Sequence, residues 1–153
     1  MESVLCFKCP IGYIKIVCEN DFVTEVKIID EPVSSTEFLS EEALKCKLQL
    51  EEYFEGKRKE FDLKLDAKGT PFRKTVWNEL LNVPYGKTST YKNIAESISK
   101  PKAVRAVGGA NHNNPIWIII PCHRIIGSDG SLTGYGGGIW RKEYLLKLES
   151  ENK

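Results

Sequence analysis

Short, mainly apolar runs separated by turn residues dominate the first third of the chain. They are rich in β-branched and aromatic side chains, which is typical of β-strands. The runs cover residues 4–7, 13–17 and 22–29. Turn-forming residues separate them, with Gly12 after the first run and Asn20 after the second. The pattern therefore predicts an antiparallel meander of three strands.

One amphipathic helix and a last short strand are expected next. Ser40 is a good N-cap residue, and the helical pattern runs from there to Glu55, where a glycine follows. Apolar residues then alternate over 61–65, which predicts a further strand. The small polar segment that follows indicates a boundary between an N-terminal α/β domain with a structural role, residues 1–67, and a second domain, residues 68–153.

Apolar residues spaced by three and four predict that the second domain is mainly helical. Helices are expected to begin at Pro71, Thr90, Ala103 and Ile139. The middle two are short and joined by a tight turn, which favours a helix-turn-helix. A buried strand over 116–120 and a glycine-rich loop over 127–138 complete the pattern. The fold class is therefore α+β.

Charge is distributed unevenly along the chain, although the net charge is only +1. Residues 1–67 hold 9 Lys and Arg against 15 Asp and Glu, a net of −6, and residues 68–153 hold 13 against 6, a net of +7. A basic second half suggests a polyanionic partner, although charge runs are usually solvated surfaces. No apolar run is long enough to span a membrane, and no signal peptide opens the chain, so a cytoplasmic protein is expected.

The five cysteines do not form a recognisable disulfide or metal motif. An odd number without a signal peptide argues against a secreted disulfide framework. No CxxC pair is matched by a second, and both histidines lie in the second half. We therefore expect no metal. Cys6, Cys9 and Cys18 are interpreted as buried or half-exposed thiols on strands, which behave as small apolar side chains.

Cys122 is the candidate nucleophile because it follows an apolar run and a proline and precedes His123 and Arg124. A thiol reacts as the thiolate, which needs a nearby base or cation. Adjacent side chains on an extended chain point apart, so His123 reaches the sulfur only if the backbone turns or a water intervenes. Glu149 is a candidate to orient the imidazole. The alternative is a buried cysteine beside a hydrogen-bonded histidine.

The glycine-rich loop has its own possible chemistry. Gly136 to Gly138 lead into the last helix, where backbone N–H groups can approach a ligand closely and favour anions. Tyr135 can stack on a planar group or cover the loop. A long flexible connection is the simpler alternative.

Four sequence blocks resemble the O6-alkylguanine-DNA alkyltransferases, in that family's order and spacing. They are residues 105–111, Asn114-Pro115, Pro121-Cys122-His123-Arg124-Ile125-Ile126, and residues 134–138. The similarity is strong over residues 70–150 and weaker before. It implies a ribonuclease H-like first domain, a winged-helix second domain, and single-use, irreversible repair of O6-alkylguanine in duplex DNA.

The resemblance also implies a catalytic set. Cys122 is similar to the alkyl acceptor, His123 with a bound water to the base, and Glu149 to the acid that holds the histidine. Tyr91 resembles the tyrosine that helps to rotate the phosphate and donates to the guanine ring. Asn114 resembles the residue that bridges the recognition helix to the active-site turn.

Contacts to DNA and to the flipped base are implied in the same way. Arg105 resembles the arginine that fills the space left by the flipped nucleotide, on a helix whose small residues allow close approach to the minor groove. The implied DNA-binding residues are Lys102, Arg105, Ala106, Gly109 and Tyr91. The implied base-binding residues are Tyr91, Cys122, Ile125, Tyr135, Gly136 and Lys142, with the carbonyls of Cys122 and Ile125 accepting from the exocyclic amine. The Gly136 N–H would contact O6, and Lys142 would support the tyrosine.

Three positions depart from the family pattern. Gly136 stands where some members have serine, which removes a side-chain contact and is expected to widen the pocket. Trp117 stands where a smaller residue is common and is expected to fill the core. No histidine lies in the first half, so the structural zinc of some relatives is not expected. The resulting prediction is a monomer without a cofactor that acts on duplex DNA, nucleoid-associated in a prokaryote, and not on membranes.

Two other functions fit parts of the pattern. A helix-turn-helix protein that only recognises lesions would tolerate Cys122→Ala. A cysteine hydrolase using Cys122, His123 and Glu149 would turn over repeatedly and need no DNA, but the basic second half and Arg105 disfavour it.

Overall fold

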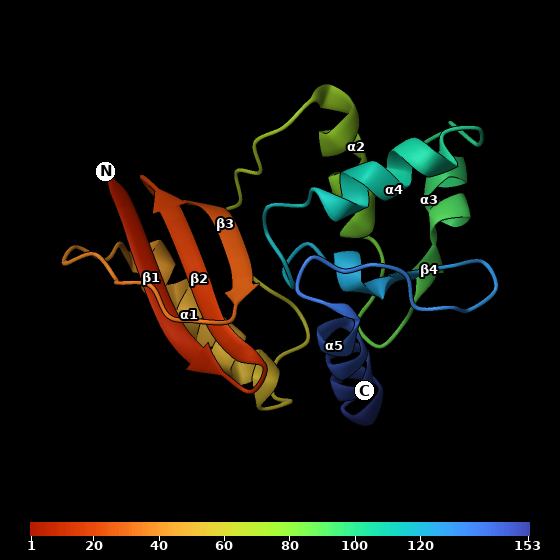
Figure 1. Cartoon of the computed structure of the whole chain (residues 1–153). Helices are drawn as coiled ribbons and strands as arrows, with labels where there is room; N and C mark the ends of the chain where they lie inside the picture. The colour runs from red at the N-terminus through yellow and green to blue at the C-terminus, as the bar shows by residue number, and fades with distance from the viewer.

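The computed structural model describes all 153 residues, and its first half is a three-stranded antiparallel sheet with one helix across a face (Figure 1). The strands are β1 (Glu2–Cys9), β2 (Gly12–Glu19) and β3 (Phe22–Ile29), in that spatial order. Helix α1 (Glu41–Phe54) packs against all three. The Ser40 hydroxyl caps it by accepting from the Ala43 N–H. The predicted meander and helix are confirmed.

The predicted strand over 61–65 is wrong. Only one isolated bridge forms, a parallel one between Leu65 and Val23 of β3. Side chains of α1 bind two backbone donors of this segment, because Gln49 accepts from the Asp62 N–H at 2.9 Å and Glu42 accepts from the Lys64 N–H at 2.6 Å. The segment is thus held mainly by the helix and touches the sheet only at Val23, whose N–H donates to the Lys64 carbonyl and whose carbonyl accepts from the Asp66 N–H, both at 2.8 Å.

The second half is a group of helices, as predicted. They are α2 (Pro71–Leu80), α3 (Tyr91–Ser97), α4 (Val104–His112) and α5 (Ile139–Glu151). Helices α3 and α4 pack on each other and on α2, which is the expected helix-turn-helix. Two short strands, β4 (Ser89–Thr90) and β5 (Ile125–Ile126), pair in parallel beside it. In Figure 1 the sheet and the helices form two distinct halves of the molecule.

Residues 116–120 are buried, as predicted, but they do not form a strand. Ile116 makes a single bridge to Val26 of β3, and the chain then turns, with the Ile120 N–H donating to the Ile116 carbonyl at 3.1 Å. Ile118 adopts a φ of 72°, which is unusual for a β-branched residue. A short apolar run does not by itself distinguish a strand from another buried conformation. Here the turn brings the chain back toward α4.

The two halves share one apolar core, and polar contacts also join them. Arg141 of α5 is buried and donates to the carbonyls of Ile11, after β1, and Gly137, in the glycine-rich loop. It also pairs with Asp30 at 2.8 Å. None of the helices combines the length and apolar character that crossing a bilayer requires. No group of three or more His, Cys, Asp or Glu side chains is arranged to hold a metal.

Candidate active site

Cys122 lies at the start of a single 3₁₀ turn, Cys122–Arg124. Pro121 precedes it, and the Arg124 N–H donates to the Pro121 carbonyl at 3.0 Å. The thiol is buried, with 4% of the residue exposed. The sequence alone left open whether the backbone turns here. It does, so Cys122 and His123 no longer follow the opposed directions of an extended chain.

Two asparagines at the end of α4 fasten this turn. Asn114 donates its amide to the carbonyls of Ile120, at 2.9 Å, and Ile116, at 3.2 Å. Asn111 donates to the Cys122 carbonyl at 3.4 Å. Asn114 therefore lies where the bridge between the recognition helix and the active-site turn was predicted. Asn111 adds a second link, which the sequence did not suggest.

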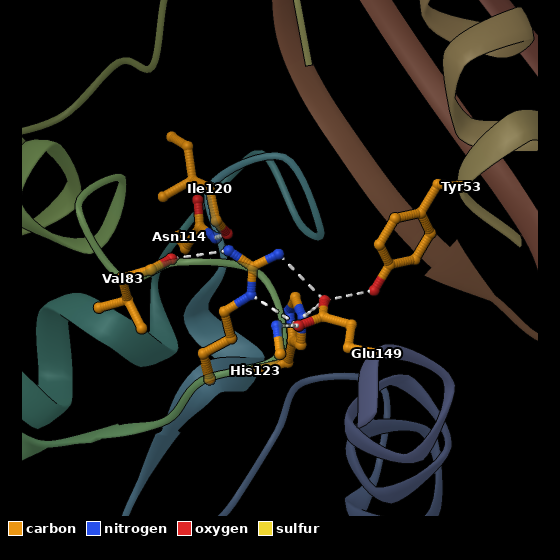
Figure 2. A network of polar contacts seen from close by, with 8 residues as sticks. Tyr53, Val83, Asn114, Ile120, His123 and Glu149 are labelled. Carbon is orange, nitrogen blue, oxygen red and sulfur yellow. Dashed lines mark hydrogen bonds and ion pairs between the residues drawn. The ribbon is translucent and has the colours of Figure 1, made fainter. Parts of the chain in front are cut away.

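The Glu149 carboxylate is the centre of a buried polar network (Figure 2). Its Oε2 accepts from His123 Nε2 at 2.6 Å, from the Tyr53 hydroxyl at 2.6 Å and from Arg124 Nη2 at 3.1 Å. Its Oε1 accepts from Arg124 Nε at 2.8 Å and from the Gly86 N–H at 3.2 Å. Arg124 also donates to the Val83 carbonyl at 2.7 Å. The predicted contact between Glu149 and His123 is present.

These contacts set the protonation of the network. Burial alone raises the pKa of Glu149. Hydrogen bonds from His123 and Arg124, the charge of Arg124 and, in the acid range where Glu149 titrates, that of protonated His123 outweigh burial and hold this pKa well below its usual range. Burial lowers the pKa of His123 despite the attraction of Glu149. The network therefore holds a carboxylate, a guanidinium and a neutral imidazole. Buried charges are tolerated when they are paired in this way.

The neutral imidazole has a defined tautomer. Glu149 is an acceptor only, so His123 Nε2 must carry the proton that it donates. Nδ1 is then the unprotonated nitrogen, and it is buried with no hydrogen-bond partner within the protein. An unpaired buried acceptor is costly unless something uses it. Nδ1 is thus an available proton acceptor on the residue that follows Cys122.

The cysteine itself rests as a thiol. Burial raises the pKa of Cys122 to about 11, and interaction with the Asn114 side chain and the charge of Lys142 lower it only in part. A thiol with this pKa is almost fully protonated at neutral pH, so it needs a base in order to react.

The contacts of the predicted base-binding residues Lys142 and Tyr91 differ in one respect from the expectation. Lys142 is fully buried and donates to the carbonyls of Ile125, at 2.5 Å, and Thr133, at 3.3 Å. The Tyr91 hydroxyl pairs with the Thr133 hydroxyl at 2.5 Å. Lys142 therefore reaches the tyrosine through Thr133, without a direct hydrogen bond. The Cys122 carbonyl already accepts from the Ile125 N–H within the turn.

Trp117 and Gly136, the two unusual positions, lie in contact. A Cβ built on Gly136 would be 2.7 Å from Trp117 Cζ2, and one on Gly137 would be 3.1 Å from Cζ3. The indole also packs on the Tyr135 ring, with 5.3 Å between centroids. Gly136 therefore does not widen the pocket as expected, because Trp117 occupies that space. The indole N–H donates to the Asn114 carbonyl at 2.9 Å.

Helix α4 exposes the residues predicted to meet DNA. Lys102, just before the helix, and Arg105, Ala106 and Gly109 on it are all exposed. Val107, on the opposite face, is fully buried. Nothing lies within 4 Å of a Cβ built on Gly109, so this surface is smooth and open. Arg105 forms no ion pair with any side chain of the protein. Its insertion into DNA stays a prediction.

Sequence reasoning missed two members of the buried network. Arg124 carried a signal, since a guanidinium beside a buried cysteine needs a partner, but the two-pronged contact to Glu149 was not foreseen. Tyr53 carried none, because it lies 96 residues from Glu149 and fits the apolar face of α1 like any core aromatic.

Comparison with known proteins identifies two family models along the chain. The 6-O-methylguanine DNA methyltransferase ribonuclease-like domain matches residues 5–67, and the DNA binding domain of the same family matches residues 71–151. A methylated-DNA–protein-cysteine methyltransferase of Methanosarcina barkeri is 56% identical over 135 residues, which cover 86% of this chain and 83% of that protein. One of Methanosarcina acetivorans is 49% identical and covers 94% of this chain and 95% of that protein.

Solved structures show the same similarity. The crystal structure of Mycobacterium tuberculosis OGT in complex with DNA matches with a TM-score of 0.87 and 44% identity. The match covers 96% of this chain and 92% of that one. Both the sequence matches and this structural match extend over nearly the whole molecule.

Proposed function

Because the chain belongs to the O6-methylguanine DNA methyltransferase family, and is thus a DNA-binding methyltransferase of DNA alkyl repair, we propose that it acts once. It transfers one alkyl group irreversibly from O6-alkylguanine in duplex DNA to Cys122. The base is flipped out of the helix for the reaction, and the protein acts as a monomer.

One observation carries the proposal: the residue after the buried Cys122 is a buried histidine, held neutral, whose Nδ1 has no hydrogen-bond partner within the protein. Such a pair has no evident structural purpose, since buried polar groups are normally satisfied. It suits a reaction in which the thiol must lose its proton at the moment of attack. His123 Nδ1, directly or through one water, takes that proton, and Glu149 stabilises the imidazolium.

The transfer balances without another reagent. The Cys122 thiolate forms a bond to the alkyl carbon, the carbon–O6 bond breaks, and its electron pair stays on guanine. The guanine anion takes a proton from the Tyr91 hydroxyl. His123 releases the proton taken from the thiol to solvent, and the Tyr91 phenolate takes one up from solvent, so no net proton is gained or lost. The Gly136 N–H stabilises the developing charge at O6. The product is a thioether, which water does not cleave, so the protein is used once.

The exposed face of α4 fits the DNA side of the reaction. The reacting carbon is inaccessible within a stacked duplex, so the base has to leave the helix. Arg105 projects from a helix of small residues and carries a charge that no protein group neutralises. It is suited to fill the gap left by the base, while the small residues approach the minor groove.

Mass spectrometry tests the proposal directly. The full-length protein is mixed with a duplex holding one O6-methylguanine, and the intact protein and its peptides are weighed. We expect one added methyl group per molecule, on the peptide that contains Cys122, and none with Cys122→Ser. Cys46→Ser is the matched control, because Cys46 is equally buried but lies in α1.

Each other outcome contradicts the proposal in its own way. Binding without methylation would indicate a lesion-recognition module. If the protein neither binds the duplex nor becomes methylated, the cysteine hydrolase becomes the favoured function. Methylation of a different cysteine would disprove the assignment of Cys122.

A further inference from the structure

Tyr53 is the one side chain of the N-terminal half that hydrogen-bonds to the catalytic carboxylate. It lies near the end of α1 and points toward Glu149 across the boundary between the halves (Figure 2). The other donors to Glu149 are Gly86, His123 and Arg124, all from the second half. The ribonuclease-like domain thus reaches the active site itself.

Packing alone does not require the Tyr53 hydroxyl. The ring is fully buried against Phe54, Phe61 and Tyr85, with centroids 5.5, 5.7 and 6.2 Å away. A phenylalanine would fill this space equally well. A buried hydroxyl is unfavourable unless it finds a partner, and this one donates to a carboxylate at 2.6 Å. The position of the hydroxyl therefore points to a role at Glu149.

We infer that Tyr53 is a positioning residue for alkyl transfer, which acts through Glu149 to keep His123 neutral and ready to accept the thiol proton. The inference rests on the proposed function of Cys122. It gives the N-terminal half a part in the chemistry, beyond the structural role expected from the sequence.

The reason lies in competition for one oxygen. Tyr53 and His123 both donate to Glu149 Oε2, and each donor weakens the oxygen as an acceptor for the other. Without the tyrosine hydroxyl, the carboxylate attracts the His123 proton more strongly. This attraction favours the imidazolium and raises the pKa of His123. More His123 is then already protonated at a given pH and cannot act as a base.

Other charged or titratable groups lie around Glu149 and His123 on the neighbouring elements. They are Arg124 and Cys122 in the 3₁₀ turn, Lys142 on α5, Tyr135 in the glycine-rich loop and Tyr85 after α2. Tyr53→Phe leaves all of them in place. A shift in the titration of His123 would therefore come from the missing hydroxyl.

Nuclear magnetic resonance titration of the two histidines is the direct test, and it needs neither DNA nor activity. In Tyr53→Phe we expect the pKa of His123 to rise by about one pH unit, as a lost hydrogen bond to the counter-ion predicts. His112 is exposed on α4 and serves as the internal reference. Tyr85→Phe is the matched control, since the Tyr85 hydroxyl is buried without a hydrogen-bond partner. An unchanged His123 in Tyr53→Phe would overturn the inference.

Single-turnover kinetics with methylated duplex supply the second readout. The rate should rise with pH as His123 becomes neutral, and Tyr53→Phe should move the midpoint upward by the same amount, with a rate close to that of the unsubstituted protein at high pH. A uniform loss at every pH would mean that Tyr53 only supports the fold. If the unsubstituted protein transfers no methyl group, the proposed function fails, while the titration result stands by itself.

A second variant keeps the test available if Tyr53→Phe does not fold. Incorporation of 3-fluorotyrosine at position 53 retains the hydroxyl but makes it a stronger donor. The pKa of His123 should then fall, which is opposite in sign to the effect of Tyr53→Phe. A rise or no change would contradict the inference.

Discussion

The side chains around Glu149 and those on the outer face of α4 are held in opposite ways. Glu149, His123 and Arg124 are buried, and each makes hydrogen bonds at fixed distances. Arg105 and Lys102 are exposed and form no ion pair. A buried charge requires a partner within the fold, whereas an exposed one is solvated and free to move. The protein thus sets the protonation around Glu149 by itself, whereas the exposed charges of α4 are left for a partner, which we propose is DNA.

The difference predicts two separable classes of variant. Changes in the buried network should alter stability and chemistry on every substrate. Changes on α4 should leave stability and chemistry intact and affect only reactions in duplex DNA.

Glu149→Gln should have the largest effect. The amide cannot neutralise Arg124, and it presents an N–H that disturbs the tautomer of His123. The transfer rate should fall on the order of 10⁴-fold, by analogy with the loss of the acid in other catalytic triads. The free energy of unfolding should fall by about 3–5 kcal/mol, because a buried charge is left uncompensated. Single-turnover assays and urea unfolding measure the two effects.

Glu143→Gln is the control for this prediction, since Glu143 lies on the same helix but is exposed. It should change neither quantity by more than the scatter expected for a surface substitution. A Glu149→Gln variant with an unchanged free energy of unfolding would show that Glu149 is not needed to compensate the buried charge of Arg124.

Arg105→Ala should have the next largest effect, confined to duplex substrates. An inserted arginine offsets the few kcal/mol needed to unstack a base, so its loss should slow repair of duplex by about 10²-fold. Reaction with a free O6-alkylguanine base should be unchanged, as should the unfolding free energy. Lys147→Ala, an exposed cation on α5, is the control. Equal losses on both substrates would exclude the insertion role.

Local patterns predicted the secondary structure where the fold depends on neighbours in sequence. Strands β1 to β3, the Ser40 cap and the helix-turn-helix were all predicted correctly. Prediction failed at residues 61–65 and 116–120, where long-range contacts decide the conformation. Gln49 and Glu42 bind the first segment, and a turn at Ile118 reverses the second.

The candidate site likewise divides into residues that local sequence reveals and residues that only long-range contacts reveal. The sequence pointed to Cys122, His123 and Glu149, first through the residues around Pro121 and then through the resemblance to a family, because motifs and their order are visible in a sequence. It did not supply Tyr53, whose partner lies in the other half of the chain. It also treated Trp117 and Gly136 as two separate departures, although they are in contact in the fold.

Trp117 and Gly136 give the prediction with the smallest effect, and they belong to neither of the two regions compared above. The indole fills the space where a serine side chain at position 136 would go, so Gly136→Ser alone forces Trp117 to move and should cost about 1–3 kcal/mol of stability. In a Trp117→Ala background the serine has room, and this cost should vanish. A double-mutant cycle by urea unfolding measures the difference.

The same two residues test whether Trp117 limits the size of the alkyl group that is transferred, separately from the effect of the network around Glu149 on the transfer rate. Trp117→Ala removes a large ring beside Gly136, so the ratio of benzyl to methyl transfer rates should rise by about tenfold, the scale on which pockets discriminate apolar groups. The variant will itself be less stable by about 3–5 kcal/mol, so rates are compared at a temperature where it is folded. Because the ratio divides out any general damage to Cys122 and His123, an unchanged ratio would mean that Trp117 only fills the core, as the sequence first suggested.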